Sequence, residues 1–217
     1  MKIKKNLKVL AINVCLRPYK PEIMFPLGLS YVASAIYRAG YDLEIVDLDR
    51  YKTPEQEIKN LLRHKDFDVA AFGCIVTGYK IIKKLSQIVR DVKKDAIIIA
   101  GNSVADSIPD ILLKKTEVDI AVIGEGEITI VEILDKLNQS KSLKSLQSIR
   151  GIWYKDGNKI ISNPQREVIK DIDSMPFLKW DLFDMGAYIK SARDLANEPL
   201  PMPKEKIRAF MINTARG

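Results

Sequence analysis

Three segments of the sequence place glycine beside small or polar side chains directly after an apolar run. They are Gly73 to Thr77, Gly101 to Ser103 and Gly124 to Glu127. Glycine lets the backbone approach a ligand closely, and hydroxyl, amide or carboxylate groups beside it can hydrogen-bond to that ligand. None of the segments carries the lysine of a triphosphate-binding loop, so they favour a large, mostly neutral ligand with amide and ribose-like groups.

Two of these segments also have an explanation that needs no ligand. The small residues around Gly73 and Cys74 make room either for something flat or bulky or for close packing of a helix against the strand. The acids Glu125 and Glu127 fall in the expected first turn of a helix, where they favour hydroxyl or amide donors on a ligand or simply complement the helix dipole. A dinucleotide fingerprint is excluded, because its glycines should follow the first strand, which ends at Asn13 to Cys15.

The sequence holds two cysteines and one histidine, which are common metal ligands and catalytic side chains. Cys15 and Cys74 are too few for a disulfide framework or an all-cysteine metal site, so we expect reduced thiols that pack as small apolar groups. His64 lies at the end of a helical pattern, on the edge opposite the glycine segments. We therefore predict no catalytic residue and no metal ligand in this chain. A phosphoacceptor domain is disfavoured, because Cys74 stands where an aspartate should end the third strand.

The elements that position these residues follow from the alternation of short β-branched runs with longer helical patterns in residues 1–140. That alternation predicts a parallel sheet with helices on both faces. The predicted strands are 8–14, 42–47, 69–74, 96–100 and 120–123; the predicted helices are 27–39, a second one that Thr53 caps and Pro54 opens, 80–93, 108–115 and 127–137. Loops after parallel strands meet at the carboxyl edge of a sheet, so we expect the three glycine segments in one crevice.

Composition restricts the class of protein. The chain has 217 residues, 47% of them hydrophobic, which is enough for one core with an appendage. Its 35 basic and 28 acidic residues give a net charge of +7, but the lysines are interspersed with acids, which predicts a solvated surface rather than a nucleic-acid-binding face. No apolar run approaches the roughly 18 residues of a membrane span, and the start lacks the cleavage pattern of a signal peptide. We expect a cytoplasmic protein.

The composition changes after residue 140. Two apolar runs, Gly151 to Tyr154 and Lys159 to Ser162, flank the turn Lys155 to Asn158 and predict a β-hairpin. Proline becomes frequent beyond residue 163, which indicates a connector, and Lys206 to Thr214 predicts one more strand. We therefore divide the chain into a domain at 1–140 and a hairpin with connector at 141–217.

In this order, the motifs resemble the amino-terminal part of cobalamin-binding radical SAM proteins, which include cobalamin-dependent methyltransferases and the anaerobic magnesium-protoporphyrin monomethyl ester cyclase. The segments that carry the resemblance are 26–47, 73–77, 97–129, the hairpin with its Asn163-Pro164, and 171–185. The resemblance implies an α/β fold of the flavodoxin-like, Rossmann-like cobalamin-binding type: a five-stranded parallel sheet with helices on both faces, plus a C-terminal hairpin and connector. Thr214 to Gly217 resembles the residues before the CxxxCxxC motif, so the resemblance implies a radical SAM barrel missing from this sequence.

The resemblance further implies cobalamin as the cofactor of this domain, with the corrin over the carboxyl edge and the loop from Cys15 to Phe25 facing the cobalt. The cofactor-binding residues implied are Asn13, Cys15, Gly73, Cys74, Thr77, Gly101, Asn102, Ser103, Gly124, Glu125, Gly126 and Glu127. Two departures stand out. The DxHxxG motif that ligates cobalt through histidine is missing, as in several radical SAM relatives, and Asn102 stands where relatives often have a second glycine, which narrows the tail pocket.

By this resemblance, the chain presents a corrinoid for methyl transfer or cyclase-type chemistry carried out by the missing barrel, which is its expected partner. The 4Fe-4S cluster and S-adenosylmethionine belong only to that barrel, so the chain alone should be inactive, and specificity for the small-molecule substrate should also lie there. The alternative is a cofactor-free scaffold or docking module packed against the barrel. A free-standing nucleotide-binding domain is a third reading, disfavoured because no phosphate motif occurs.

Overall fold

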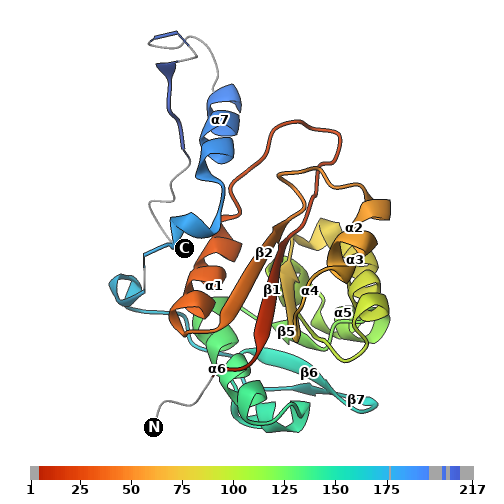
Figure 1. The fold of residues 1–217 in the computed structure, drawn as a ribbon. Helices are drawn as coiled ribbons and strands as arrows, with labels where there is room; N and C mark the ends of the chain where they lie inside the picture. The colour runs from red at the N-terminus through yellow and green to blue at the C-terminus, as the bar shows by residue number, and fades with distance from the viewer. Residues whose placement is uncertain (1–4, 176, 196–201, 204–205, 211–217) are drawn as a thin grey trace.

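A seven-stranded mixed sheet forms the centre of the fold in a computed structural model, which describes residues 5–175, 177–195, 202–203 and 206–210 (Figure 1). The strand order is β2-β1-β3-β4-β5-β6-β7, and the first five of these are parallel. The parallel part has the 2-1-3-4-5 order of flavodoxin-like folds, as expected. The strands are β1 (Lys8–Asn13), β2 (Asp42–Asp47), β3 (Val69–Gly73), β4 (Ile97–Gly101), β5 (Ile120–Val122), β6 (Ile152–Asp156) and β7 (Lys159–Ser162).

Helices cover both faces of the sheet. Helices α1 and α6 pack on one face, and α2, α3, α4 and α5 pack on the other (Figure 1). A further helix, α7, lies beyond the amino end of α1, on the side of the carboxyl edge of the sheet, in the view of Figure 1. The helices are α1 (Leu27–Arg38), α2 (Glu55–Arg63), α3 (Tyr79–Val92), α4 (Ser103–Ser107), α5 (Pro109–Lys115), α6 (Gly126–Gln139) and α7 (Met185–Leu195). No helix in this described part is long and apolar enough to cross a bilayer.

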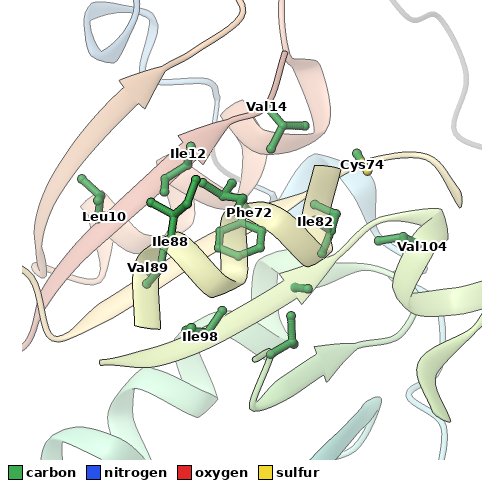
Figure 2. Packing of buried hydrophobic residues seen from close by; sticks show 14 of the residues in the cluster. Leu10, Ile12, Val14, Phe72, Cys74, Ile82, Ile88, Val89, Ile98 and Val104 are labelled. Atoms are coloured by element: carbon green, nitrogen blue, oxygen red, sulfur yellow. The ribbon is translucent and has the colours of Figure 1, made fainter. Parts of the chain in front are cut away.

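Two hydrophobic cores result, because successive strand side chains point to opposite faces of the sheet. On β1, Leu10 and Ile12 face the core under α2 and α3, whereas Val9 faces the core under α1 and α6. Figure 2 shows the first of these cores, in which Phe72 of β3 and Ile82 of α3 pack together. The two-sided burial explains why the inner parallel strands, β1, β3, β4 and β5, read as apolar runs in the sequence.

The predicted hairpin forms, and it continues the parallel sheet instead of standing apart from it. β6 pairs antiparallel with β5, with Tyr154 opposite Ile120 and Trp153 opposite Ala121. Tyr154 is fully buried in the core under α6, which fixes the hairpin against the sheet. The five parallel strands and the hairpin are thus confirmed, and together they make one mixed sheet.

Three expectations about elements are wrong in detail. Thr53 does not cap α2, whose N-cap residue is Pro54 and which has no side-chain cap hydrogen bond. Helix α4 was not expected, because it has only five residues and no sequence period to reveal it. The described part of the expected last strand, Lys206 and residues 207–210, forms no strand, since Phe210 packs its ring 5.2 Å from Phe25 instead. The remainder of that segment, 211–214, lies outside the described residues.

Candidate functional site

The carboxyl ends of neighbouring strands lie level with one another. Asn13 of β1 pairs in register with Asp47 of β2 and with Gly73 of β3, and Gly73 pairs with Gly101 of β4. The loops that follow these strands therefore start side by side along one edge. This arrangement is the one expected of the glycine segments, and it makes the edge the candidate site.

Two of the loops touch through their backbones. A Cβ atom on Gly73 would lie 2.6 Å from the carbonyl oxygen of Gly101 and 3.3 Å from the Cβ atom of Asn102. Only glycine fits at such an approach. Hydrogen bonds complete the contact, because Val76 N donates to Ser103 Oγ at 3.0 Å. The loops after β3 and β4 thus form one unit, and at Gly73 the small residue serves close packing.

Asn102 has an unusual backbone conformation, with φ of 67° and ψ of −174°. This region of conformational space is almost restricted to glycine. Its side chain is exposed, and its Oδ1 accepts a hydrogen bond from Ser103 N at 2.6 Å. Beside it, a Cβ atom on Gly101 would meet no atom within 4 Å. The edge therefore has open space over Gly101 that the Asn102 side chain borders.

The two thiols differ in exposure. Cys74 is buried, and its thiol donates to the carbonyl of Ile75 at 3.1 Å. Burial raises the pKa of the Cys74 thiol to about 11, so it is protonated at neutral pH and does not offer a thiolate to a metal. Cys15 is only partly buried, and burial, followed by a hydrogen bond with Asp49, raises its pKa as well. Neither cysteine is paired in a disulfide.

Apolar side chains are exposed around the same edge. Leu16 from the loop after β1 and Ile75 and Val76 from the loop after β3 are 38%, 50% and 38% exposed, and Thr77 beside them is exposed too. The loops adjoin, since a Cβ atom on Gly78 would lie 2.8 Å from Leu16 Cδ2. Such a rim can cover the apolar face of a large ligand.

In the segment after β5, one acid bonds to the connector and the other is buried. Gly124 has a φ of 74°, and its N–H donates to Asp106 Oδ1 at 2.7 Å. Glu125 accepts a hydrogen bond from Ile169 N of the connector at 2.5 Å, and Glu127 is buried. A Cβ atom on Gly126 would lie 3.3 Å from Val32 Cγ2 of α1, so this glycine serves helix packing. Contact of these four residues with a ligand stays a prediction.

The Asn13 side chain is hydrogen-bonded within the protein. Its Nδ2 donates to Asp47 Oδ1 at 2.8 Å, and Asp47 also accepts hydrogen bonds from Arg50 N and from the hydroxyl of Tyr188 on α7. The sequence did not indicate Asp47 or Tyr188 as site residues. The position of Asp47 at the end of a predicted strand was a usable signal, whereas the contact with Tyr188 spans 141 positions and had none.

Lys52 organises the loop after β1, which the sequence had not suggested. Its Nζ donates to the carbonyls of Glu22 at 3.1 Å and Arg17 at 3.4 Å, and it forms an ion pair with Asp49 at 2.9 Å. The residues that these bonds hold up, 16–21, are all exposed. Lys52 therefore anchors this loop, while residues 16–21 remain exposed to solvent.

The donor set of this edge fits a macrocycle better than a bare metal ion. The described residues contain no group of three or more His, Cys, Asp or Glu side chains that could hold a metal. His64 follows α2 directly, on the far edge, and is exposed. Backbone groups, an amide, hydroxyls and exposed apolar side chains remain, around the open space at Gly101.

A family model and several known proteins match this chain. The model of the B12 binding domain family matches residues 21–134. An uncharacterized methyltransferase of Pyrococcus horikoshii is 26% identical over 164 residues, which are 75% of this chain and 35% of that protein. The anaerobic magnesium-protoporphyrin IX monomethyl ester cyclase of Cereibacter sphaeroides is 23% identical over 194 residues, 88% of this chain and 30% of that protein. The chain thus spans about a third of the length of these relatives.

Two solved structures share the fold. The cobalamin-dependent S-adenosylmethionine radical enzyme OxsB, with aqua-cobalamin bound, superposes with a TM-score of 0.69 and 18% identity over 86% of this chain and 25% of that chain. The radical S-adenosylmethionine methyltransferase TsrM from Kitasatospora setae, with cobalamin and a [4Fe-4S] cluster bound, gives a TM-score of 0.58 and 16% identity over 72% of this chain and 30% of that chain.

Proposed function

The chain belongs to the B12 binding domain family, and on that premise we propose that it binds a cobalamin at the carboxyl edge of its parallel sheet. The observation that carries the proposal is the coincidence of two findings. The matched residues, 21–134, include all three glycine segments, and the strand ends before two of them lie level at one edge. The family match supports binding of a cobalamin by this part of the chain, and the geometry supports the carboxyl edge as its location.

The edge offers the groups that a corrinoid needs. The open space over Gly101 and the exposed rim at Leu16 and Ile75 suit a broad macrocycle, because its faces are mostly apolar. Thr77 and the backbone around Gly124 can hydrogen-bond to the amide side arms. Cys74 and Gly73 contribute by close packing below the surface. When bound, the corrinoid would supply a cobalt centre able to carry a methyl group.

We propose further that the corrinoid is presented to a radical SAM domain, which would hold the 4Fe-4S cluster and S-adenosylmethionine. Support comes from the relatives, which are about two to three times as long as this chain and are called a methyltransferase and a cyclase. In this proposal residues 1–140 bind and 141–217 connect, although the hairpin completes the sheet of the first part. A cytoplasmic location is part of the same proposal, and the substrate is left to the radical SAM domain.

Reconstitution with hydroxocobalamin tests the binding. After gel filtration the chain should carry close to one corrinoid, seen by its visible absorbance. Gly101→Leu should lower the affinity at least about tenfold, because the new side chain enters open space without straining the strand. Gly101→Ala should have a smaller effect, and Ser162→Leu on the exposed end of β7 should have none.

A chain that retains no corrinoid contradicts the proposal and favours the cofactor-free docking module. Equal affinities for the wild type and Gly101→Leu would contradict the location of the site while leaving the binding itself intact. Far-UV circular dichroism of each variant shows whether the fold is kept, which separates a blocked site from a lost one.

A further inference from the structure

The loop between β1 and α1, residues 14–26, is held at both ends by the helix α7. This helix comes from the connector, more than 160 positions later in the chain. Three sets of contacts make the attachment: through Asp47 to Asn13, directly at Ile23, and at Phe25, where Phe183 just before α7 takes part. Each is made by side chains that are buried or partly buried.

The first attachment is a hydrogen-bonded chain at the beginning of the loop. The Tyr188 hydroxyl donates to Asp47 Oδ2, while Asp47 Oδ1 accepts from Asn13 Nδ2 at 2.8 Å and from Arg50 N at 3.0 Å. Tyr188 is only 1% exposed. Its burial, and next its hydrogen bond with Asp47, raise the pKa of the phenol, so the proton stays on the tyrosine and points at the carboxylate.

The second attachment is at the end of the loop. Ser191 Oγ accepts from Ile23 N at 2.8 Å and donates to the Ile23 carbonyl at 2.9 Å, so one hydroxyl satisfies both backbone groups of that residue. Next to it, the Phe25 ring lies 5.2 Å from the rings of both Phe183 and Tyr188. These ring contacts have edge-on geometry, which is favourable for aromatic pairs.

The middle of the loop lacks comparable burial. Residues 16–21 are exposed, and Lys52 reaches this part only through the carbonyls of Arg17 and Glu22. The position of the exposed residues therefore depends on Lys52 and on how firmly the two ends of the loop are fixed. Helix α7 reaches both ends, through Asp47 at Asn13 and directly at Ile23.

We propose that α7 sets the position of the β1–α1 loop over the candidate site, with Tyr188 and Ser191 as positioning residues. The proposal rests on the proposed function insofar as the loop faces a corrinoid. It goes beyond that function by making the connector, and whatever binds the connector, able to tighten or loosen one wall of the site. The link runs through the Tyr188, Asp47 and Asn13 hydrogen bonds on one side and through Ser191 and Ile23 on the other.

Hydrogen–deuterium exchange of the ligand-free chain tests the link directly. Tyr188→Phe removes only the hydroxyl and keeps the ring in the aromatic cluster, and Ser191→Ala removes both bonds to Ile23. Each should speed amide exchange in residues 15–22 by about threefold to tenfold, the size expected for the loss of one or two hydrogen bonds, and Ser191→Ala should also speed exchange at Ile23 N, which loses its acceptor. Two matched controls should leave this segment unchanged: Tyr154→Phe, whose buried hydroxyl has no hydrogen-bond partner among the described residues, and Ser86→Ala on α3.

Affinity for hydroxocobalamin is the second measurement. We expect both variants to weaken it by a similar factor, with the exchange of the β3 and β4 amides unaltered. An unchanged exchange rate in residues 15–22, or a rise spread evenly over the sheet, overturns the positioning role. Faster loop exchange with unchanged affinity would overturn the link to the site. If the wild type takes up no corrinoid, the proposed function fails, and the exchange experiment still decides whether α7 holds the loop.

Discussion

Asn102 shows how much a single residue can constrain this edge. Its backbone sits in a region that costs about 1 to 3 kcal/mol for a residue with a side chain. The hydrogen bond from Ser103 N to Asn102 Oδ1 offsets part of that cost. The strain places an amide group beside the open space at Gly101. A glycine at this position would relieve the strain and remove that group, so the choice of asparagine bears on the shape of the site.

Cys74 gives a pH-dependent prediction at the same scale. Its pKa is raised from 9.0 to about 11 by burial, so between these values the thiol ionises in the unfolded chain but not in the folded one. The unfolded state then binds fewer protons, and the free energy of unfolding falls as pH rises through this window. The stability contributed by the buried neutral thiol is complete below pH 9 and lost by about pH 11.

Urea unfolding of the wild type and Cys74→Ala at pH 7.5, 9 and 10.5, under reducing conditions, measures this effect. The difference in unfolding free energy between the two proteins should shrink by about 1.9 kcal/mol between pH 7.5 and 10.5, because pH 10.5 lies about 1.5 units above the unfolded pKa and below the folded one, at about 1.36 kcal/mol per unit. The other titrating groups are common to both proteins and cancel. Parallel pH profiles would show that the thiol is not desolvated in the way its burial indicates.

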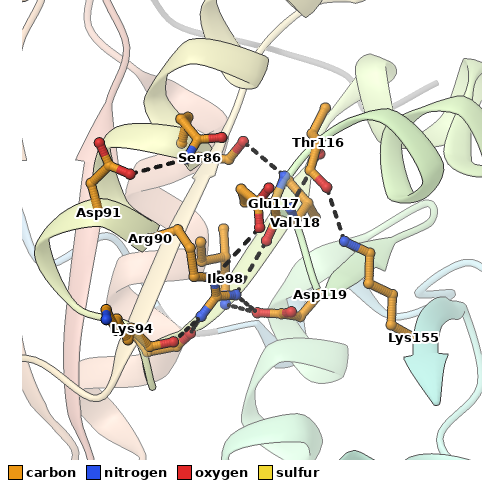
Figure 3. A network of polar contacts seen from close by, with 12 residues as sticks. Ser86, Arg90, Asp91, Lys94, Ile98, Thr116, Glu117, Val118, Asp119 and Lys155 are labelled. Carbon is orange, nitrogen blue, oxygen red and sulfur yellow. Dashed lines mark hydrogen bonds and ion pairs between the residues drawn. The ribbon is translucent and has the colours of Figure 1, made fainter. Parts of the chain in front are cut away.

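At the scale of elements, one arginine joins the end of α3 to the beginnings of two strands (Figure 3). Arg90 donates to the carbonyls of Lys94 and Ala96 at 2.6 and 2.7 Å, and to Asp119 Oδ2 at 2.7 Å. The same carboxylate oxygen accepts from Ile98 N at 2.8 Å at the start of β4. This network closes the amino edge of the sheet, opposite the candidate site.

Arg90→Met should therefore lower the free energy of unfolding by about 2 to 4 kcal/mol, because it leaves several partly buried acceptors without a donor. Arg63→Met, which loses only an exposed contact with Asn60, should change it by less than about 0.5 kcal/mol. Urea denaturation of both variants measures the difference. A loss below about 1 kcal/mol in Arg90→Met would show that water replaces the arginine at this edge.

Most elements could be predicted because their signals are local. Strand 42–47 was predicted at its observed bounds, since a half-buried edge strand between two aspartates has a clear pattern. The pairing of β6 with β5 could not be predicted, because it depends on which edge of the sheet is open once the chain has folded. The docking of α7 on the loop after β1 could not be predicted for the same reason. Tyr188 and Ser191 make their contacts across more than 140 positions, and the weakly periodic connector sequence carries no signal for them.

The whole molecule combines a family fold with a connector that returns to the edge where the candidate site lies. From β7 the chain runs past α6 and α1 to α7, with Ile169 N bonded to Glu125 and Lys179 N bonded to Ser34 Oγ on the way (Figure 1). The connector thus touches both the loop after β5 and the loop after β1. The connector therefore holds the loops after β1 and β5, whereas the loops after β3 and β4 hold each other.

Amide exchange of the chain with and without hydroxocobalamin tests the central claim, that the corrinoid sits on the carboxyl edge, most directly. The account predicts protection in residues 15–22, 73–78, 101–103 and 124–126, because these loops would lie under or beside the macrocycle. The amino edge around Arg90 and Asp119 should be unaffected. Protection at the amino edge, or on the outer face of α2 near His64, with the four loops unchanged, would contradict the account.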